Sequence, residues 1–126
     1  MPTGIMLTDD LIFYSRVAAT ATGAGVTVKQ ARTPEATLDL ARQGLPGGVL
    51  IDLNLVGPQL PAFLAELRAI CSPLPRLVGY GSHVDTETLK AARAAGVDEV
   101  MPRSQFVKVL DARLAGWLVP AASPEA

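Results

Sequence analysis

The sequence predicts an α/β fold, in which a five-stranded parallel sheet carries helices on both faces. Short apolar runs alternate with longer segments that have apolar residues at helical spacing, five times along the 126 residues. Gly and Pro residues separate these segments, as expected for turns. With 49% hydrophobic and 18% charged residues, the chain has enough apolar side chains to bury a core and is not typical of a disordered protein.

The first part of the chain alternates strand, helix, strand, helix and strand. An apolar run predicts a strand over 4–8, and apolar residues at helical spacing predict a helix over 11–21. Glycines end this helix before a second strand over 26–29. A threonine followed by a proline suits the N-cap and first turn of a helix over 34–44. A Pro-Gly-Gly turn then leads into an apolar third strand over 49–52.

The second part of the chain continues the alternation. A helix that begins near residue 58 or 61 ends before two prolines, and a fourth strand follows over 76–80. An aspartate is placed to cap an alanine-rich helix over 86–95, which a glycine ends. The fifth strand is expected over 98–101, and a serine is placed to cap a last helix over 104–117.

This order of elements determines the expected topology. Parallel strands joined by helices need right-handed crossovers, which place helices on both faces of the sheet. The prediction is a flavodoxin-like, doubly wound three-layer fold with strand order 2-1-3-4-5, whose ligand cleft lies beside the first and third strands. No linker or repeat divides the chain. We therefore expect one domain over 1–119, and a flexible tail over 120–126 because that segment is small and polar.

Composition argues against several classes of protein. The net charge is −1 and the charges are interspersed, which does not favour binding to nucleic acid or to an acidic membrane surface. No apolar run approaches the length of a transmembrane helix, and no signal-peptide pattern opens the chain. A single cysteine, Cys71, allows no internal disulfide and is typical of a reducing compartment. A cytoplasmic protein is therefore expected.

Charged residues follow three of the predicted strands. Asp9 and Asp10 follow the first strand, Asp52 ends the third, and Arg103 follows the fifth. Because the carboxyl ends of parallel strands lie at one edge of a sheet, these groups are expected to converge. Carboxylates about 4 Å apart repel by roughly 4 kcal/mol at an effective dielectric constant near 20, so such a cleft needs a proton or a cation. Mg²⁺ suits it, and Asp52 could then attack a phosphoryl donor. The alternative is that these acids only cap the helices that follow.

Three segments of the chain resemble the receiver domains of response regulators, and the resemblance covers essentially the whole length. One is similar to the phosphoacceptor segment of receivers: Ile51-Asp52-Leu53-Asn54-Leu55-Val56-Gly57. Another is similar to their acid pair and the opening turn of their first helix: Asp9-Asp10-Leu11-Ile12-Phe13. The third is similar to the segment that leads into their fifth strand: Ala95-Gly96-Val97-Asp98-Glu99-Val100.

This resemblance implies roles for individual residues. Asp52 would be the phosphoacceptor, and Asp9 and Asp10 would bind Mg²⁺ together with Asp52 and the backbone carbonyl of Asn54. A register shifted by one residue would instead align Thr8 and Asp9 with the acid pair and leave Asp10 outside. Mg²⁺ is the only cofactor that the resemblance implies, and no organic cofactor is expected.

The chain departs from the receiver pattern at the residues that respond to phosphorylation. Receivers carry Ser or Thr at the end of the fourth strand, but here counting back from the Ala-Gly segment gives Gly81, and counting forward along the strand gives Tyr80. Ser82 is adjacent, and His83, the only histidine, could contact an anion or titrate near neutral pH. Arg103 stands where receivers have Lys, so it keeps the charge but loses the compact ammonium group.

We therefore expect a stand-alone, receiver-like module of two-component signalling, not an enzyme, in which phosphorylation of Asp52 is weak or absent. It would contact a sensor kinase or a downstream target through the face formed by 86–95, 98–101 and 104–117. A homodimer is an alternative, and Trp117-Leu118-Val119 could be either an exposed patch or part of the core. The runner-up function is a fully working phosphoacceptor regulator. A small flavodoxin-like enzyme or cofactor carrier is more remote.

Overall fold

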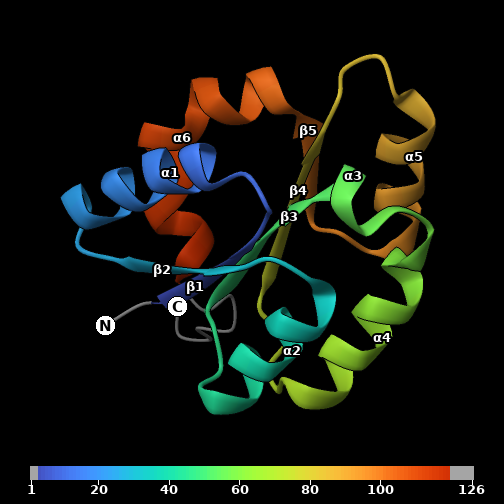
Figure 1. Cartoon of the computed structure of the whole chain (residues 1–126), viewed down its shortest axis with the longest axis horizontal. Helices are drawn as coiled ribbons and strands as arrows, with labels where there is room; N and C mark the ends of the chain where they lie inside the picture. Colours follow the sequence, from blue (N-terminus) through green and yellow to red (C-terminus); the bar gives the residue numbers. More distant parts are fainter. Residues whose placement is uncertain (1–2, 120–126) are drawn as a thin grey trace.

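The fold is a parallel five-stranded sheet between two layers of helices (Figure 1). The computed structural model describes residues 3–119, so the predicted tail at 120–126 lies outside the described residues. The strand order is β2-β1-β3-β4-β5, which confirms the predicted doubly wound fold and its topology. The strands are β1 (Thr3–Leu7), β2 (Thr27–Ala31), β3 (Gly48–Asp52), β4 (Arg76–Gly81) and β5 (Glu99–Pro102).

Helices cover both faces of the sheet (Figure 1). One layer contains α1 and α6, and the other contains α2, α4 and α5, with the short α3 at the end of β3. The helices are α1 (Leu11–Gly23), α2 (Pro34–Gln43), α3 (Leu53–Val56), α4 (Leu60–Ile70), α5 (Thr86–Ala95) and α6 (Arg103–Leu118). No helix among residues 3–119 is both long enough and apolar enough to cross a membrane.

Side-chain caps explain where several helices begin. Asp10, Thr33 and Asp85 each accept a hydrogen bond from the backbone N–H three residues further on, which satisfies one of the free donors at the helix start. Gly96 ends α5 in the left-handed region, at φ 103°, where glycine is favoured.

One expectation about helix starts was wrong, and one short helix was not predicted. The last helix begins at Arg103 rather than after a Ser104 cap, because Pro102 holds the extended backbone that precedes it, at φ −63° and ψ 151°. Helix α4 starts at Leu60, beside Pro61 as expected, but α3 and a 3₁₀ turn, Gly57–Gln59, precede it. Four residues are too few to show helical periodicity, so the pattern of apolar residues does not indicate α3.

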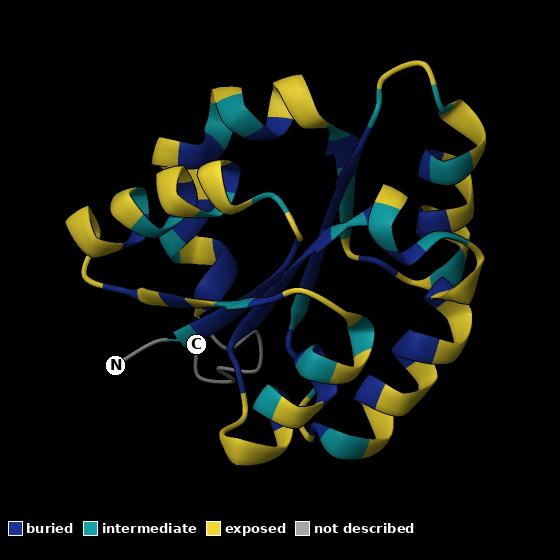
Figure 2. Ribbon diagram, viewed as in Figure 1, coloured by how far each residue is buried: buried dark blue, intermediate teal, exposed yellow. Residues whose placement is uncertain are grey.

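The core has two parts, one on each side of the sheet (Figure 2). Along β3, Val49 and Ile51 pack under α2, α4 and α5, whereas Leu50 faces α1 and α6. All three are fully buried, since a sheet covered on both faces needs apolar residues at every strand position. The side under α1 and α6 also contains four aromatic side chains: Phe13, Tyr80, Phe106 and Trp117.

The end of α6 belongs to this core. Trp117 and Leu118 are 1% and 0% exposed, so these two residues do not form the exposed patch that was one of the two alternatives. The Trp117 indole N–H donates to Glu99 Oε2 at 3.2 Å. Of the three residues in this segment, only Val119 is exposed, at 45%. The backbone of α6 approaches β3 so closely that a Cβ at Gly48 would lie 2.2 Å from the Trp117 carbonyl oxygen.

We predict that Gly48→Ala lowers the free energy of unfolding by about 1–3 kcal/mol, because the added methyl meets backbone that cannot move alone. Gly116→Ala is the matched control. Its Cβ would meet no atom within 4 Å, and alanine in a helix should raise stability by up to about 1 kcal/mol. Urea denaturation of the two variants measures both effects. Equal stability of Gly48→Ala and wild type would contradict the close approach of α6 to β3.

Candidate functional site

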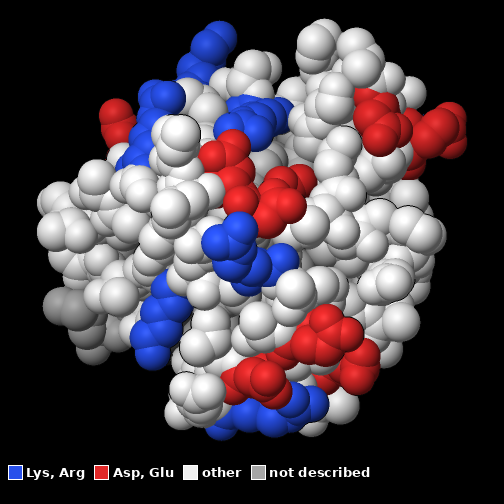
Figure 3. Space-filling model, viewed as in Figure 1, with Lys and Arg blue, Asp and Glu red and all other residues white. Residues whose placement is uncertain are grey.

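The charged residues that follow the strands meet at one edge of the sheet. A small pocket of about 230 Å³ lies there, lined by Asp52, Asn54, Tyr80, Gly81, Ser82 and Arg103. Acidic side chains gather at the centre of this face, with basic side chains on either side (Figure 3). The parallel pairing of β1, β3, β4 and β5 brings these residues together. Convergence of these groups was predicted from the sequence.

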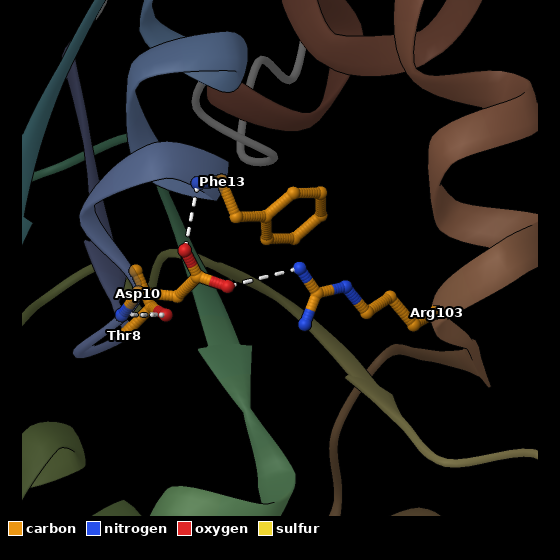
Figure 4. A network of polar contacts seen from close by, with 4 residues as sticks. All are labelled: Thr8, Asp10, Phe13 and Arg103. Carbon is orange, nitrogen blue, oxygen red and sulfur yellow. Dashed lines mark hydrogen bonds and ion pairs between the residues drawn. The ribbon is translucent and has the colours of Figure 1, made fainter.

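Asp10 binds both the start of α1 and Arg103 (Figure 4). Its Oδ1 accepts from the Phe13 backbone N–H at 2.9 Å, and its Oδ2 is 3.1 Å from Arg103 Nη2. The Asp10 backbone N–H donates to the Thr8 hydroxyl at 3.1 Å. The bond from the Phe13 amide, followed by the bond from Arg103, holds the pKa of Asp10 below its usual value.

Arg103 reaches this carboxylate from the first residue of α6. Its guanidinium carbon lies 4.0 Å from the centroid of the Phe13 ring, so the cation rests on an aromatic face while it pairs with Asp10 (Figure 4). Phe13 therefore contributes a backbone donor to Asp10 and a ring to Arg103. The packing of Arg103 on the Phe13 ring was not predicted, because the two residues are far apart along the chain.

Asp52 lies at the end of β3 and is partly buried. Its Oδ1 accepts from the Asn54 backbone N–H at 3.1 Å and so caps α3. Burial raises the pKa of Asp52, and the negative charge of Asp9 adds to the rise. Backbone bonds from Leu55 and Asn54 and the charge of Arg103 oppose it. Asp9 is exposed, and it is the member of the acid pair whose charge acts on Asp52.

Tyr80 is the residue beside Asp52 on the neighbouring strand. The β3–β4 register pairs Asp52 with Tyr80. At the next residue, Gly81, a side chain would point toward the side-chain oxygen of Asn54. The Tyr80 hydroxyl is buried and has no hydrogen-bond partner among residues 3–119. Burial strongly raises the pKa of this phenol. The nearby Thr8 hydroxyl opposes that rise, although the geometry between the two groups is too poor for a hydrogen bond.

Ser82 and His83 have different positions relative to the pocket. Ser82 is half-buried and lines it, and its hydroxyl accepts only a long bond, 3.4 Å, from the Val84 backbone N–H. His83 is exposed and is not among the residues that line the pocket. The structure thus brings Ser82, Asp52, Asn54 and Arg103 together and leaves His83 outside.

The described side chains do not fit a divalent metal in this arrangement. Among residues 3–119, no three His, Cys, Asp or Glu side chains lie close enough to hold a metal ion. Both oxygens of Asp10 are occupied, one by the α1 cap and one by Arg103, and one oxygen of Asp52 accepts from the Asn54 amide. The Asn54 backbone carbonyl, which the resemblance names as a metal ligand, receives no helical hydrogen bond from the residue four positions later. That residue is Pro58, which has no N–H. Arg103 supplies the positive charge at this site.

We predict that Tyr80→Phe leaves the free energy of unfolding unchanged or raises it by up to about 1 kcal/mol, because the lost hydroxyl makes no hydrogen bond. Tyr14→Phe is the matched control. The Tyr14 hydroxyl donates to the Val28 carbonyl at 2.7 Å, so its loss should cost about 0.5–1.5 kcal/mol. Urea denaturation compares the two variants, and an equal loss in both would show that the Tyr80 hydroxyl is bonded.

We also predict that Asp52→Asn raises the melting temperature at neutral pH. A carboxyl whose pKa is raised on folding stabilises the folded state below its unfolded pKa, near 3.8, and this contribution is lost as the pH rises through the folded value. Asparagine keeps the helix cap and carries no charge. The difference between the variant and wild type should therefore shrink below about pH 4. Calorimetry across this range checks it, and a variant less stable than wild type at neutral pH would contradict the raised pKa.

Several solved structures that superpose on this chain are response regulators. A response regulator from Thermotoga maritima superposes with a TM-score of 0.78 at 16% identity, over 94% of this chain and 98% of that one. A putative response regulator from Chloroflexus aurantiacus J-10-fl gives 0.76 at 21% identity, over 92% and 96%. The N-terminal domain of a response regulator/sensory box/GGDEF 3-domain protein from Carboxydothermus hydrogenoformans gives 0.72 at 19%, over 92% and 93%.

No protein-family model matches the sequence, and the search of curated proteins gave no match. The likeness to the three solved structures is therefore one of fold, at low sequence identity and over nearly the full length of each chain. On that ground, the chain has the fold of response-regulator receiver domains.

Proposed function

We propose that this chain is a receiver-like signal-transduction module in which Asp52 is phosphorylated weakly or not at all, and which acts through protein contacts. One observation carries the proposal: the position beside Asp52 on β4 is held by Tyr80, whose hydroxyl is buried. The receiver fold and the placement of Asp52 at the end of β3 support a role in signalling. The cleft would then serve as a scaffold rather than as a catalytic centre.

Phosphoryl transfer to a carboxylate needs a nucleophile and groups that stabilise charge on the transferring oxygens. Asp52 can be the nucleophile. Arg103 already pairs with Asp10, so it would have to leave that carboxylate to reach a phosphoryl group on Asp52. The Tyr80 ring packs 5.4 Å from Phe13 and 4.7 Å from Phe106, and its hydroxyl could bind a phosphoryl oxygen only if this packing changed. Both requirements would weaken phosphoryl transfer to Asp52 and the structural response to phosphorylation.

A working phosphoacceptor regulator is the second candidate, and Ser82 is the observation that favours it. Ser82 lines the same pocket as Asp52 and Arg103, and its hydroxyl is bound only by the long contact from Val84. A small shift of this loop could bring that hydroxyl to a phosphoryl group. In this case Arg103 would stabilise the phosphoryl oxygens in place of the lysine of receivers.

Protein contacts would use the face formed by α5, β5 and α6. Exposed charged side chains of both signs lie on these helices, among them Glu87, Lys90, Lys108 and Arg113. A polar surface of this kind suits a reversible contact with a sensor kinase or a downstream target. A homodimer through the same face is the alternative arrangement, and no nucleic-acid partner is proposed.

The test is the intact mass of the protein after incubation with a small phosphodonor and Mg²⁺. We expect at most a few per cent of wild-type molecules to gain a phosphoryl group, because Arg103 and Tyr80 are committed to other contacts. Asp52→Asn is the control, and it identifies any adduct on Asp52. A nearly complete adduct on wild type that is absent from Asp52→Asn would reject weak phosphorylation and favour the second candidate.

A further inference from the structure

We infer that Arg103 is a tethered cation that takes the place of a divalent metal in this site, so that wild type binds Mg²⁺ weakly and neutralising Arg103 creates a Mg²⁺ site on Asp9, Asp10 and Asp52. The inference deepens the proposed function and rests on it, because it explains how an acidic cleft persists in a module that is weakly phosphorylated. It rests on the contact of Arg103 with Asp10, which turns that carboxylate toward the guanidinium, and on the absence of a three-carboxylate group among residues 3–119 in this arrangement.

Contacts on two sides hold Arg103 in this position (Figure 4). Its Nη2 is 3.1 Å from Asp10 Oδ2, and its guanidinium lies over the Phe13 ring at 4.0 Å. The residue before it, Pro102, restricts the backbone from which α6 starts. The guanidinium therefore lies between the start of α1 and the start of α6, and Arg103 lines the pocket that contains Asp52.

The same contacts remove Asp10 from the set of available ligands. One oxygen of Asp10 is used by the Phe13 amide and the other by Arg103, so a metal would have to displace at least one of them. Asp9 is exposed and Asp52 is partly buried, and neither forms an ion pair with any residue within 3–119. Arg103 thus pairs with one of the three carboxylates, Asp10, and leaves Asp9 and Asp52 without an ion-pair partner among residues 3–119.

The guanidinium of Arg103 supplies a lasting positive charge in place of a metal ion. Arginine does not lose its proton at physiological pH, so the site carries this positive charge under all such conditions. Mg²⁺ binds oxygen ligands and keeps several waters, and would meet a like charge here. The ion pair is half-exposed, with side chains 47% and 38% accessible, so its effect on metal affinity should be modest, about tenfold or somewhat more.

The experiment is calorimetric titration of Mg²⁺ into wild type and Arg103→Gln at neutral pH, without a phosphodonor. We expect Arg103→Gln to bind Mg²⁺ at least about tenfold more tightly than wild type, because a charged competitor is lost. In the variant, the backbone amide resonances of Asp9, Asp10 and Asp52 should shift on titration. Adding Asp10→Asn to Arg103→Gln should abolish the gain.

Arg113→Gln is the matched control. Arg113 lies on the same helix, pairs with Glu99 at 2.8 Å and sits over Trp117 at 5.7 Å, yet it is outside the pocket. Its loss should change Mg²⁺ affinity less than twofold, because no carboxylate of the site is released. Arg103→Met, which keeps apolar contact with Phe13, is a second neutral variant in case Arg103→Gln does not fold.

Three outcomes would overturn the inference: wild type binding Mg²⁺ as tightly as the neutral variants, a gain that survives Asp10→Asn, or an equal gain in Arg113→Gln. These outcomes are separable from failure of the proposed function. Extensive phosphorylation of wild-type Asp52 together with tighter Mg²⁺ binding in Arg103→Gln would reject weak phosphorylation and keep the tethered cation. No phosphoryl adduct on wild type, together with no change in Mg²⁺ affinity in Arg103→Gln, would keep weak phosphorylation and reject the tethered cation.

Discussion

The site depends on one constraint, the parallel register of β1, β3 and β4. Because Leu7 pairs with Ile51 and Asp52 pairs with Tyr80, the strands end side by side and their following residues share one edge. A shift of one residue in β4 would turn Tyr80 to the opposite face and place a glycine beside Asp52. The apolar residues on both faces of β3 oppose such a shift, since every position is matched to a core. The packing of the core therefore determines the chemistry at the edge.

The aromatic side chains join this edge to the opposite end of the sheet. Phe13 supports Arg103, Tyr80 packs against Phe13 and Phe106, and Phe106 stacks on Trp117 at 5.3 Å. Trp117 binds Glu99, which also pairs with Arg113 on the surface of α6. This region of the core is therefore filled by aromatic rings that pack against one another from the site to the end of α6.

The architecture could be predicted because it depends on patterns that are local in sequence. Alternating apolar runs and helical segments indicate the strands and their order, and aspartates at strand ends indicate where the polar site lies. Side-chain contacts across the site could not be predicted, since the pairing of Asp10 with Arg103 depends on the rotamers of two half-exposed side chains. The pairing of Tyr80 with Asp52 depends on the strand register, and the burial of Trp117 depends on the close approach of α6 to Gly48, neither of which is local in sequence.

The position of Trp117 has an optical consequence. It is the only tryptophan of the chain, it is 1% exposed, and its indole is bonded to Glu99 across the junction of β5 and α6. Fluorescence excited at the red edge of the tryptophan band therefore comes from one buried indole. Its emission reports whether α6 is seated on the sheet, without any added label. Any partner that separates α6 from β5 would shift that emission to longer wavelengths, whereas a partner that binds the outer surface alone would leave it unchanged.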